Sequence, residues 1–281
     1  MLTECHHSWP KKAITWADAD KAFVSIPFTW NLPAAYSQCV WLKNEGYEVH
    51  AGGPAVSLMP DYLKGVAIIG GEIDALPHHN DQATFTSRGC IRNCPFCAVP
   101  KIEGELRELD NWDPKPIICD NNLLACSRKH FDRVIDRLKS IKGVDFNQGL
   151  DARLLSDHHI DRLKELTLPL IRFAWDDIAS EAVVLDAINR VIKAGFSKER
   201  IRVYVLFGFN DAPDDALYRF EALKKMGLRK NNPQRYQPLD ALKKNNYVAP
   251  NWTHRELQRF MRYWAEQRYL SKVPFAEFEA V

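Results

Sequence analysis

The sequence has no hydrophobic run close to the roughly 20 apolar residues that a membrane-spanning helix needs. Residues 1–12 contain His, Trp and Pro but no apolar core, so we expect neither a secretory signal nor a membrane partner. No internal repeat or low-complexity stretch is present, so a repeat architecture is not expected. The formal net charge is only +2, which implies no strong attraction of the whole chain to polyanions.

The composition is that of an ordinary globular protein, with 46% hydrophobic and 26% charged residues in a chain of 281. Its seven cysteines are an odd number, and three of them fall within eight residues. This pattern does not suit a disulfide framework and favours a metal or redox role in a reducing compartment. We therefore expect a cytoplasmic protein.

Short β-type runs alternate with longer helical patterns along most of the chain, which predicts βα units and a mainly parallel sheet. We expect an α/β protein with a small N-terminal α/β domain over residues 1–80, a partial (β/α)6 TIM-like barrel over 81–240 and a helical extension over 241–281. The first domain is expected to have strands at 22–28, 47–51 and 66–69 and a helix at 33–44. The barrel strands are predicted at 83–86, 116–119, 144–147, 170–175, 201–207 and 235–237. The predicted helices are at 128–140, 156–166, 181–194, 213–226 and 253–268.

Polar or glycine-containing segments follow the predicted barrel strands, including 120–122, 148–153, 176–177 and 208–211. Loops are generally polar, but barrel enzymes also place their chemistry at the carboxyl ends of the strands. Six strand ends in register predict a site there.

Cys90, Cys94 and Cys97 have the spacing C-x3-C-x2-C, directly after the first predicted barrel strand. Three thiolates on one loop can each bind one iron of a 4Fe-4S cluster and leave the fourth iron without a protein ligand. Arg88 and Arg92 flank the cysteines and favour their thiolate forms. A structural zinc site is the alternative, but it needs a fourth ligand from Cys119, Cys126 or a distant histidine.

The segment from Ser87 to Cys97, SRGCIRNCPFC, resembles the signature of the radical S-adenosylmethionine (radical SAM) superfamily. Phe96 occupies the aromatic position common before the third cysteine of that signature. The resemblance covers roughly residues 83–240. It implies that S-adenosylmethionine binds the open iron and is cleaved reductively to a 5′-deoxyadenosyl radical, which abstracts hydrogen from a substrate. It also implies an electron donor such as flavodoxin or ferredoxin.

The same resemblance assigns further residues to the cofactor. Asp120, Asn121 and Asn122 stand where the superfamily has a Gly-Gly-Glu-like segment that contacts the methionyl amine, although this sequence departs from that motif. Within the segment that begins at Gln148, Asp151 is suited to a ribose hydroxyl and Arg153 to the cofactor carboxylate, unless the two form an ion pair that braces the loop. Phe209 completes the cofactor-binding set and is expected beside adenine, with Tyr236 near it. Cys119 is the one speculative catalytic candidate: it is expected to be a hydrogen-atom donor or else a core residue.

The N-terminal layer resembles a reduced form of the domain that precedes the barrel in methylthiotransferases and cobalamin-dependent radical enzymes. The Asp-x-His-x-x-Gly motif of a lower cobalamin ligand is absent, so cobalamin is not predicted. Residues 221–281 contain 12 Lys/Arg and 6 Asp/Glu, and Trp252, Tyr263 and Tyr269 lie among the arginines, which suggests a nucleic-acid substrate. The alternative is that these basic residues lie on ordinary solvated helix faces and contact no nucleic acid. A non-catalytic iron–sulfur or zinc regulatory protein is the alternative function.

Overall fold

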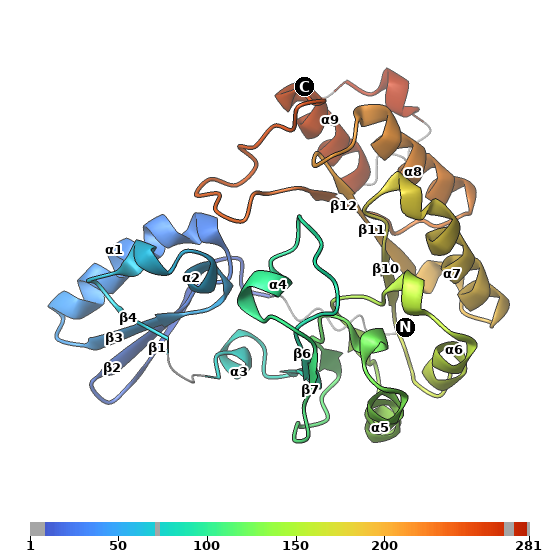
Figure 1. Cartoon of the computed structure of the whole chain (residues 1–281). Coiled ribbons are helices and arrows are strands. Elements are labelled where there is room, and N and C mark those ends of the chain that lie inside the picture. Colours follow the sequence, from blue (N-terminus) through green and yellow to red (C-terminus); the bar gives the residue numbers. More distant parts are fainter. Residues whose placement is uncertain (1–8, 71–73, 267–272, 280–281) are drawn as a thin grey trace.

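The computed structural model describes residues 9–70, 74–266 and 273–279. It consists of a small N-terminal sheet with one long helix and a larger α/β body that carries the cysteine loop (Figure 1). Each part has its own hydrophobic core, one formed by residues between 22 and 63 and the other by residues between 112 and 264. Cys5 and Tyr269 lie outside the described residues.

The N-terminal sheet has the strand order β1-β2-β3-β4. β1 pairs antiparallel with β2, whereas β2, β3 and β4 are parallel. Three of the four strands were predicted from the sequence, and the edge strand β1 was not, because most of its side chains are exposed. The strands are β1 (Ile14–Asp18), β2 (Lys21–Ser25), β3 (Glu48–Gly52) and β4 (Ile68–Ile69).

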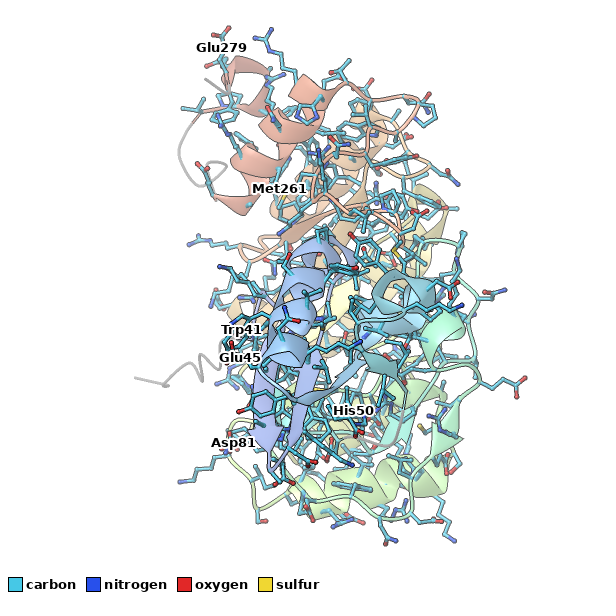
Figure 2. All side chains as sticks on the ribbon, turned by 90° about the vertical axis from the view of Figure 1, so that its left-hand side faces the viewer. Trp41, Glu45, His50, Asp81, Met261 and Glu279 are labelled. Atoms are coloured by element: carbon cyan, nitrogen blue, oxygen red, sulfur yellow. The ribbon has the colours of Figure 1, made fainter. Side chains whose placement is uncertain are left out.

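Helix α1 (Leu32–Asn44) covers one face of this sheet through its buried residues Leu32, Ala35, Cys39 and Leu42. Its outer side carries Trp41, and Glu45 directly follows its last residue; both are labelled in Figure 2. Gly46 follows the helix with a φ of +94°, the left-handed conformation that commonly ends a helix. Two short helices follow β3 and β4 and lead to the larger body: α2 (Pro54–Leu58) and α3 (Leu76–His79).

Six parallel strands of the larger body alternate with helices, so the α/β fold class is confirmed. They form two three-stranded sheets, β5-β8-β9 and β10-β11-β12, and within the described residues no closed barrel is formed. The two sheets meet through backbone hydrogen bonds beside the strands, such as Leu150 N to Arg172 O at 2.8 Å. The strands are β5 (Ala83–Thr84), β8 (Ile117–Ile118), β9 (Asp145–Phe146), β10 (Ile171–Ala174), β11 (Ile201–Phe207) and β12 (Asn232–Arg235).

The helices pack outside these strands (Figure 1). The last of them begins after the N-cap Thr253, whose reciprocal hydrogen bonds with Glu256 form the predicted capping box. Its buried ring Phe260 contacts Phe207 of β11 and Phe220, so this helix belongs to the main core. The helices are α5 (Arg128–Leu138), α6 (Asp157–Leu163), α7 (Glu181–Lys193), α8 (Pro213–Lys225) and α9 (His254–Ala265).

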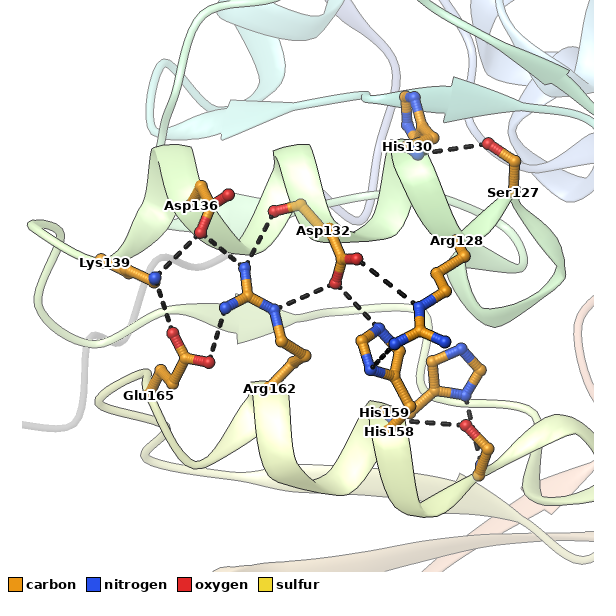
Figure 3. A network of polar contacts seen from close by, with 11 residues as sticks. Ser127, Arg128, His130, Asp132, Asp136, Lys139, His158, His159, Arg162 and Glu165 are labelled. Atoms are coloured by element: carbon orange, nitrogen blue, oxygen red, sulfur yellow. Dashed lines mark hydrogen bonds and ion pairs between the residues drawn. The ribbon is translucent and has the colours of Figure 1, made fainter.

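A polar network fixes α5 against α6 on the outside of the body (Figure 3). Arg162 donates to Asp132 at 3.0 Å and to Asp136 at 2.5 Å, and Lys139 reaches Glu165 at 2.6 Å. Arg162 and Asp132 are partly buried, whereas Asp136 and Glu165 are exposed, and ion pairs at the surface contribute little to stability, so the network mainly orients the two helices. No helix among the described residues is both long and apolar enough to cross a membrane.

Candidate iron–sulfur and cofactor site

The three cysteines lie in a loop framed by a hairpin that the sequence did not predict. Strand β6 (Ser87–Arg88) pairs antiparallel with β7 (Arg107–Glu108), and the short helix α4 (Val99–Ile102) follows the last cysteine. Gly89 has a φ of +77°, and a Cβ on it would lie 2.0 Å from the carbonyl oxygen of Glu105. Only glycine therefore fits the position directly before Cys90.

The carboxylate of Glu103 holds the start of this loop. It accepts hydrogen bonds from Arg88 Nε and Nη2 at 2.9 and 2.8 Å, from the backbone of Gly89 at 2.9 Å and from Asn121 at 2.7 Å. Burial alone would raise the pKa of Glu103, but the Arg88 partner and these hydrogen bonds hold the pKa below its ordinary value. The predicted cofactor residue Asn121 therefore binds the loop through this carboxylate.

The three thiols are half-buried and unpaired by disulfides. Burial raises the pKa of Cys94 and of Cys97, and the charges of their neighbouring thiols raise both further. Arg153 and Arg92 lower the pKa of Cys94. Thiolates at these positions repel one another. A bound metal cation offsets this repulsion, because metal binding favours deprotonated ligands.

Hydrogen-bond donors already point at Cys90 Sγ. The backbone nitrogen of Arg92 lies 3.4 Å from this sulfur, and Asn122 Nδ2 lies 3.7 Å from it. Such bonds to sulfur tune iron–sulfur clusters. Within the described residues, no three His, Cys, Asp or Glu side chains are gathered to hold one metal ion. A cubane does not need that convergence, because each thiolate binds a different iron.

Asp151 connects the cysteine loop to the residues that follow β8 and β9. Its carboxylate is 6% exposed and accepts from Arg153 at 2.6 and 3.0 Å, from Arg92 at 3.2 Å and from Asn122 at 3.1 Å. Burial would raise its pKa, but Arg153 and the other partners hold the pKa of Asp151 below its ordinary value. The ion pair between Asp151 and Arg153, which the sequence left as an alternative, is formed.

Asp120 is a buried brace beneath the loop. One carboxylate oxygen accepts from the backbone of Thr86 at 2.6 Å, and the other accepts from the hydroxyls of Thr86 at 2.5 Å and Ser87 at 2.7 Å. His130 lies 3.1 Å from the same Thr86 hydroxyl, and burial lowers the pKa of this imidazole. The carboxylate thus faces the strands below the cysteines.

Phe96 of the cysteine loop and Phe209, which follows β11, come together as predicted residues of one site. Their ring centroids are 5.7 Å apart in an edge-to-face arrangement. The ring centroid of Phe209 lies 4.7 Å from that of Tyr236, which follows β12, and the centroid of Tyr236 lies 5.3 Å from that of Tyr247. All four rings are half-buried, so they form an aromatic wall that begins at the cysteines.

Two residues beside the site were not assigned a role from the sequence. Asp176 follows β10, and burial raises its pKa to about 6, while Arg219 and Arg153 lower it. Its charge also raises the pKa of Cys94 and of Cys97. Arg219 is fully buried, donates to the carbonyls of Trp175 and Leu206 at 2.8 Å, and pairs with Asp211. An arginine at this helical position carries no sequence signal for such a role.

Other predicted residues lie apart from this arrangement. Gln148 is exposed. Cys119 is 3% exposed in a small apolar cluster with Ala83 and Ile117, and burial raises its pKa to about 12. Cys119 is thus a core residue in this structure, the second of the two expectations.

Among the described residues of the C-terminal region, the two aromatic side chains predicted to stack on bases are buried. Trp252 and Tyr263 are 4% and 0% exposed within the main core, so the expectation that they stack on nucleic-acid bases is wrong. Arg259 donates to the backbone carbonyls of Phe275, Ala276 and Phe278. Local sequence could not show this, because Trp252 packs against Phe207, which is distant along the chain, and Tyr263 packs against Phe275 and Phe278 beyond its own helix.

Comparison of the sequence with protein-family models and with curated proteins found no match.

Proposed function

We propose that this protein is a radical S-adenosylmethionine enzyme, and that its two three-stranded sheets are the halves of a partial (β/α)6 barrel. One observation carries the proposal: the cysteine loop contacts side chains that follow three of the other parallel strands of the body, and the charge of a side chain after a fourth strand acts on its cysteines. Asn122 follows β8, Asp151 follows β9, Asp176 follows β10 and Phe209 follows β11. The carboxyl ends of parallel strands are where barrel enzymes assemble their active sites.

The residues present fit a 4Fe-4S cluster. Cys90, Cys94 and Cys97 would supply three thiolates, and the donors from Arg92 and Asn122 would stabilise sulfur charge at Cys90. Arg153 adds positive charge near Cys94. Cluster and cofactor, when bound, would supply the one-electron reductive cleavage that yields a 5′-deoxyadenosyl radical.

The residues beside the cysteines also fit the polar and aromatic parts of S-adenosylmethionine. Asn122 Oδ1 is buried and has no hydrogen-bond partner, so it is an acceptor available to the methionyl amine. Phe96, Phe209 and Tyr236 offer ring faces and edges for adenine. Asp151 is already saturated by arginines, so its role in this proposal is to hold Arg92 and Arg153 in place.

Asp176 contributes a group that changes charge near neutral pH. With a pKa of about 6, its carboxyl group can hold or release a proton beside the cysteines. Arg219, through its bonds to the carbonyls of Trp175 and Leu206, fixes the ends of β10 and β11 around it. The chain itself supplies no electron, so the activity requires a one-electron donor of the flavodoxin or ferredoxin type, in a reducing compartment such as the cytoplasm.

Anaerobic reconstitution tests the cluster. We expect about four irons per chain and an electron paramagnetic resonance signal in the reduced state that changes when S-adenosylmethionine is added. Cys94→Ala should lose both, whereas Cys126→Ala, at a buried cysteine outside the loop, should retain both. One zinc per chain, or a reduced spectrum indifferent to the cofactor, would instead support the non-catalytic regulatory protein.

A further inference from the structure

The strands of the larger body have an outer side, where the helices pack, and an inner side that faces away from them (Figure 1). Ile171 and Phe173 of β10 belong to the main core on the outer side. Because side chains alternate along a strand, Arg172 and Ala174 lie on the inner side. β11 alternates in the same way: its core residues are fully buried, and the residues between them are partly exposed. We call this inner surface of the strands the inner face.

Three charged side chains meet on the inner face, one from each of three neighbouring strands. Arg172 of β10 stands beside Arg202 of β11 in the parallel register. Arg172 Nη2 donates to Asp145 Oδ2 of β9 at 2.7 Å. Burial raises the pKa of Asp145, although both arginines lower it. Two guanidinium groups therefore act on a single carboxylate, and the cluster has an excess of positive charge.

This cluster has hydrogen-bond donors that the described residues do not satisfy. Arg172 is 7% exposed, yet its Nε and Nη1 atoms have no hydrogen-bond partner. Arg202 Nε is also buried and unpartnered. Buried polar groups are nearly always hydrogen-bonded, so the unpaired donors of a buried cation point to a place where another group binds.

The inner face is open to solvent between these arginines and the cysteine loop. Ala174, the inner-face residue after Arg172, is exposed, and its partner Tyr204 in the register of β11 is partly exposed. Asp176 follows two residues later, and its charge acts on Cys94. The four residues from Arg172 to Asp176 span about 13 Å of extended chain. The inner face therefore leads from the arginines to the cysteines.

We propose that Arg172 and Arg202 bind an anionic oxygen group, a carboxylate or a phosphate, of the substrate of this enzyme. The inference rests on the proposed function and adds a substrate class to it. Guanidinium groups suit both anions, because they offer several N–H donors in a fixed plane and remain charged. A substrate anchored there extends past Ala174 toward the cysteine loop, so the group that reacts lies at the opposite end of the molecule from the anion.

Phosphate and acetate are the probes and acetamide is the neutral comparator, each titrated into the full-length protein with and without a reconstituted cluster. The Nε–H resonances of the arginine side chains are followed by nuclear magnetic resonance. We expect both anions, and not acetamide, to shift the signals of Arg172 and Arg202. The anion that binds more tightly identifies the group that the substrate carries.

Three variants separate an anion site from an ion pair that only supports the fold. Arg202→Gln should weaken phosphate binding at least about tenfold, the scale of one charge-assisted hydrogen bond. Arg255→Gln removes the same charge from the exposed side of α9 and should leave binding unchanged. Asp145→Asn removes the competing negative charge, so it should bind phosphate at least as tightly as the wild type. Equal binding by the two arginine variants, equal binding of acetate and acetamide, or weaker binding by Asp145→Asn would each overturn the proposal.

The formation of 5′-deoxyadenosine distinguishes this inference from the proposed function. A wild-type protein that forms this product but binds neither anion would refute the substrate class alone. A wild-type protein that binds both anions through Arg202 but forms no product would refute the enzyme and leave the anion site standing.

Discussion

The glycine before the first cysteine offers a sharp test of how the loop is built, because a matched glycine lies across the same turn. Gly89 and Gly104 both have a left-handed φ, of +77° and +71°, and Cys90 N donates to Gly104 O at 3.2 Å. A Cβ on Gly104 would meet nothing within 4 Å. A Cβ on Gly89 would lie 2.0 Å from Glu105 O and 2.6 Å from Glu105 C.

The two alanine variants should therefore differ by the cost of that clash. Gly104→Ala carries only the left-handed penalty of about 1–2 kcal/mol. Gly89→Ala carries the same penalty plus about 1–3 kcal/mol or more for overpacking against backbone that must move. We expect unfolding free energies lowered by about 1–2 and about 2–5 kcal/mol respectively, measured by urea unfolding of the cluster-free proteins.

The displacement should also reach the cysteines. Gly89→Ala should bind less iron after reconstitution than the wild type, and Gly104→Ala should bind as much. Equal losses of stability in the two variants, or full iron binding by Gly89→Ala, would refute this account of the loop.

Two further predictions concern the carboxyl groups of Asp120 and Asp176. Asp120→Asn turns an amide donor toward Thr86, so we expect the free energy of unfolding, measured in urea, to fall by about 2–4 kcal/mol. Asp136→Asn, on the exposed side of α5, should shift the urea midpoint little. Similar shifts in the two variants would argue against a structural role for the Asp120 carboxylate beneath the loop. Because burial raises the pKa of Asp176 from 3.8 to about 6, the folded state keeps a proton that the unfolded state loses, and stability should fall as the pH rises through that window. The fall is up to about 3 kcal/mol, and thermal melts of Asp176→Asn should lack it; an unchanged pH slope in the variant would show that another group is responsible.

The elements with strong local signals could be predicted from the sequence. Strand β11 (Ile201–Phe207) has the predicted bounds, because a seven-residue β-branched and apolar run is unambiguous. α8 ends one residue before its predicted end, and α9 begins directly after Thr253, the N-cap of the predicted capping box. The cysteine spacing predicted the position of the loop, because three thiols can bind one cluster from a short segment only if they are close in sequence.

The hairpin and the short helices around the loop could not be predicted. Strands β6 and β7 have two residues each, and the pair is defined by long-range hydrogen bonds rather than by an apolar pattern. The roles of Glu103 and Arg219 likewise depend on partners that are distant in the sequence. Asp120 and Asp151 were predicted from the sequence to bind the cofactor, and only the folded chain shows that the first accepts hydrogen bonds from Thr86 and Ser87 and the second pairs with arginines.

The production of 5′-deoxyadenosine tests the central claim most directly. Reconstituted protein is incubated anaerobically with S-adenosylmethionine and dithionite, and the products are separated and identified by mass spectrometry. The account predicts 5′-deoxyadenosine and methionine from the wild type and from Cys126→Ala, and neither product from Cys94→Ala. A wild-type protein that holds a full cluster and its cofactor but forms no 5′-deoxyadenosine would contradict it.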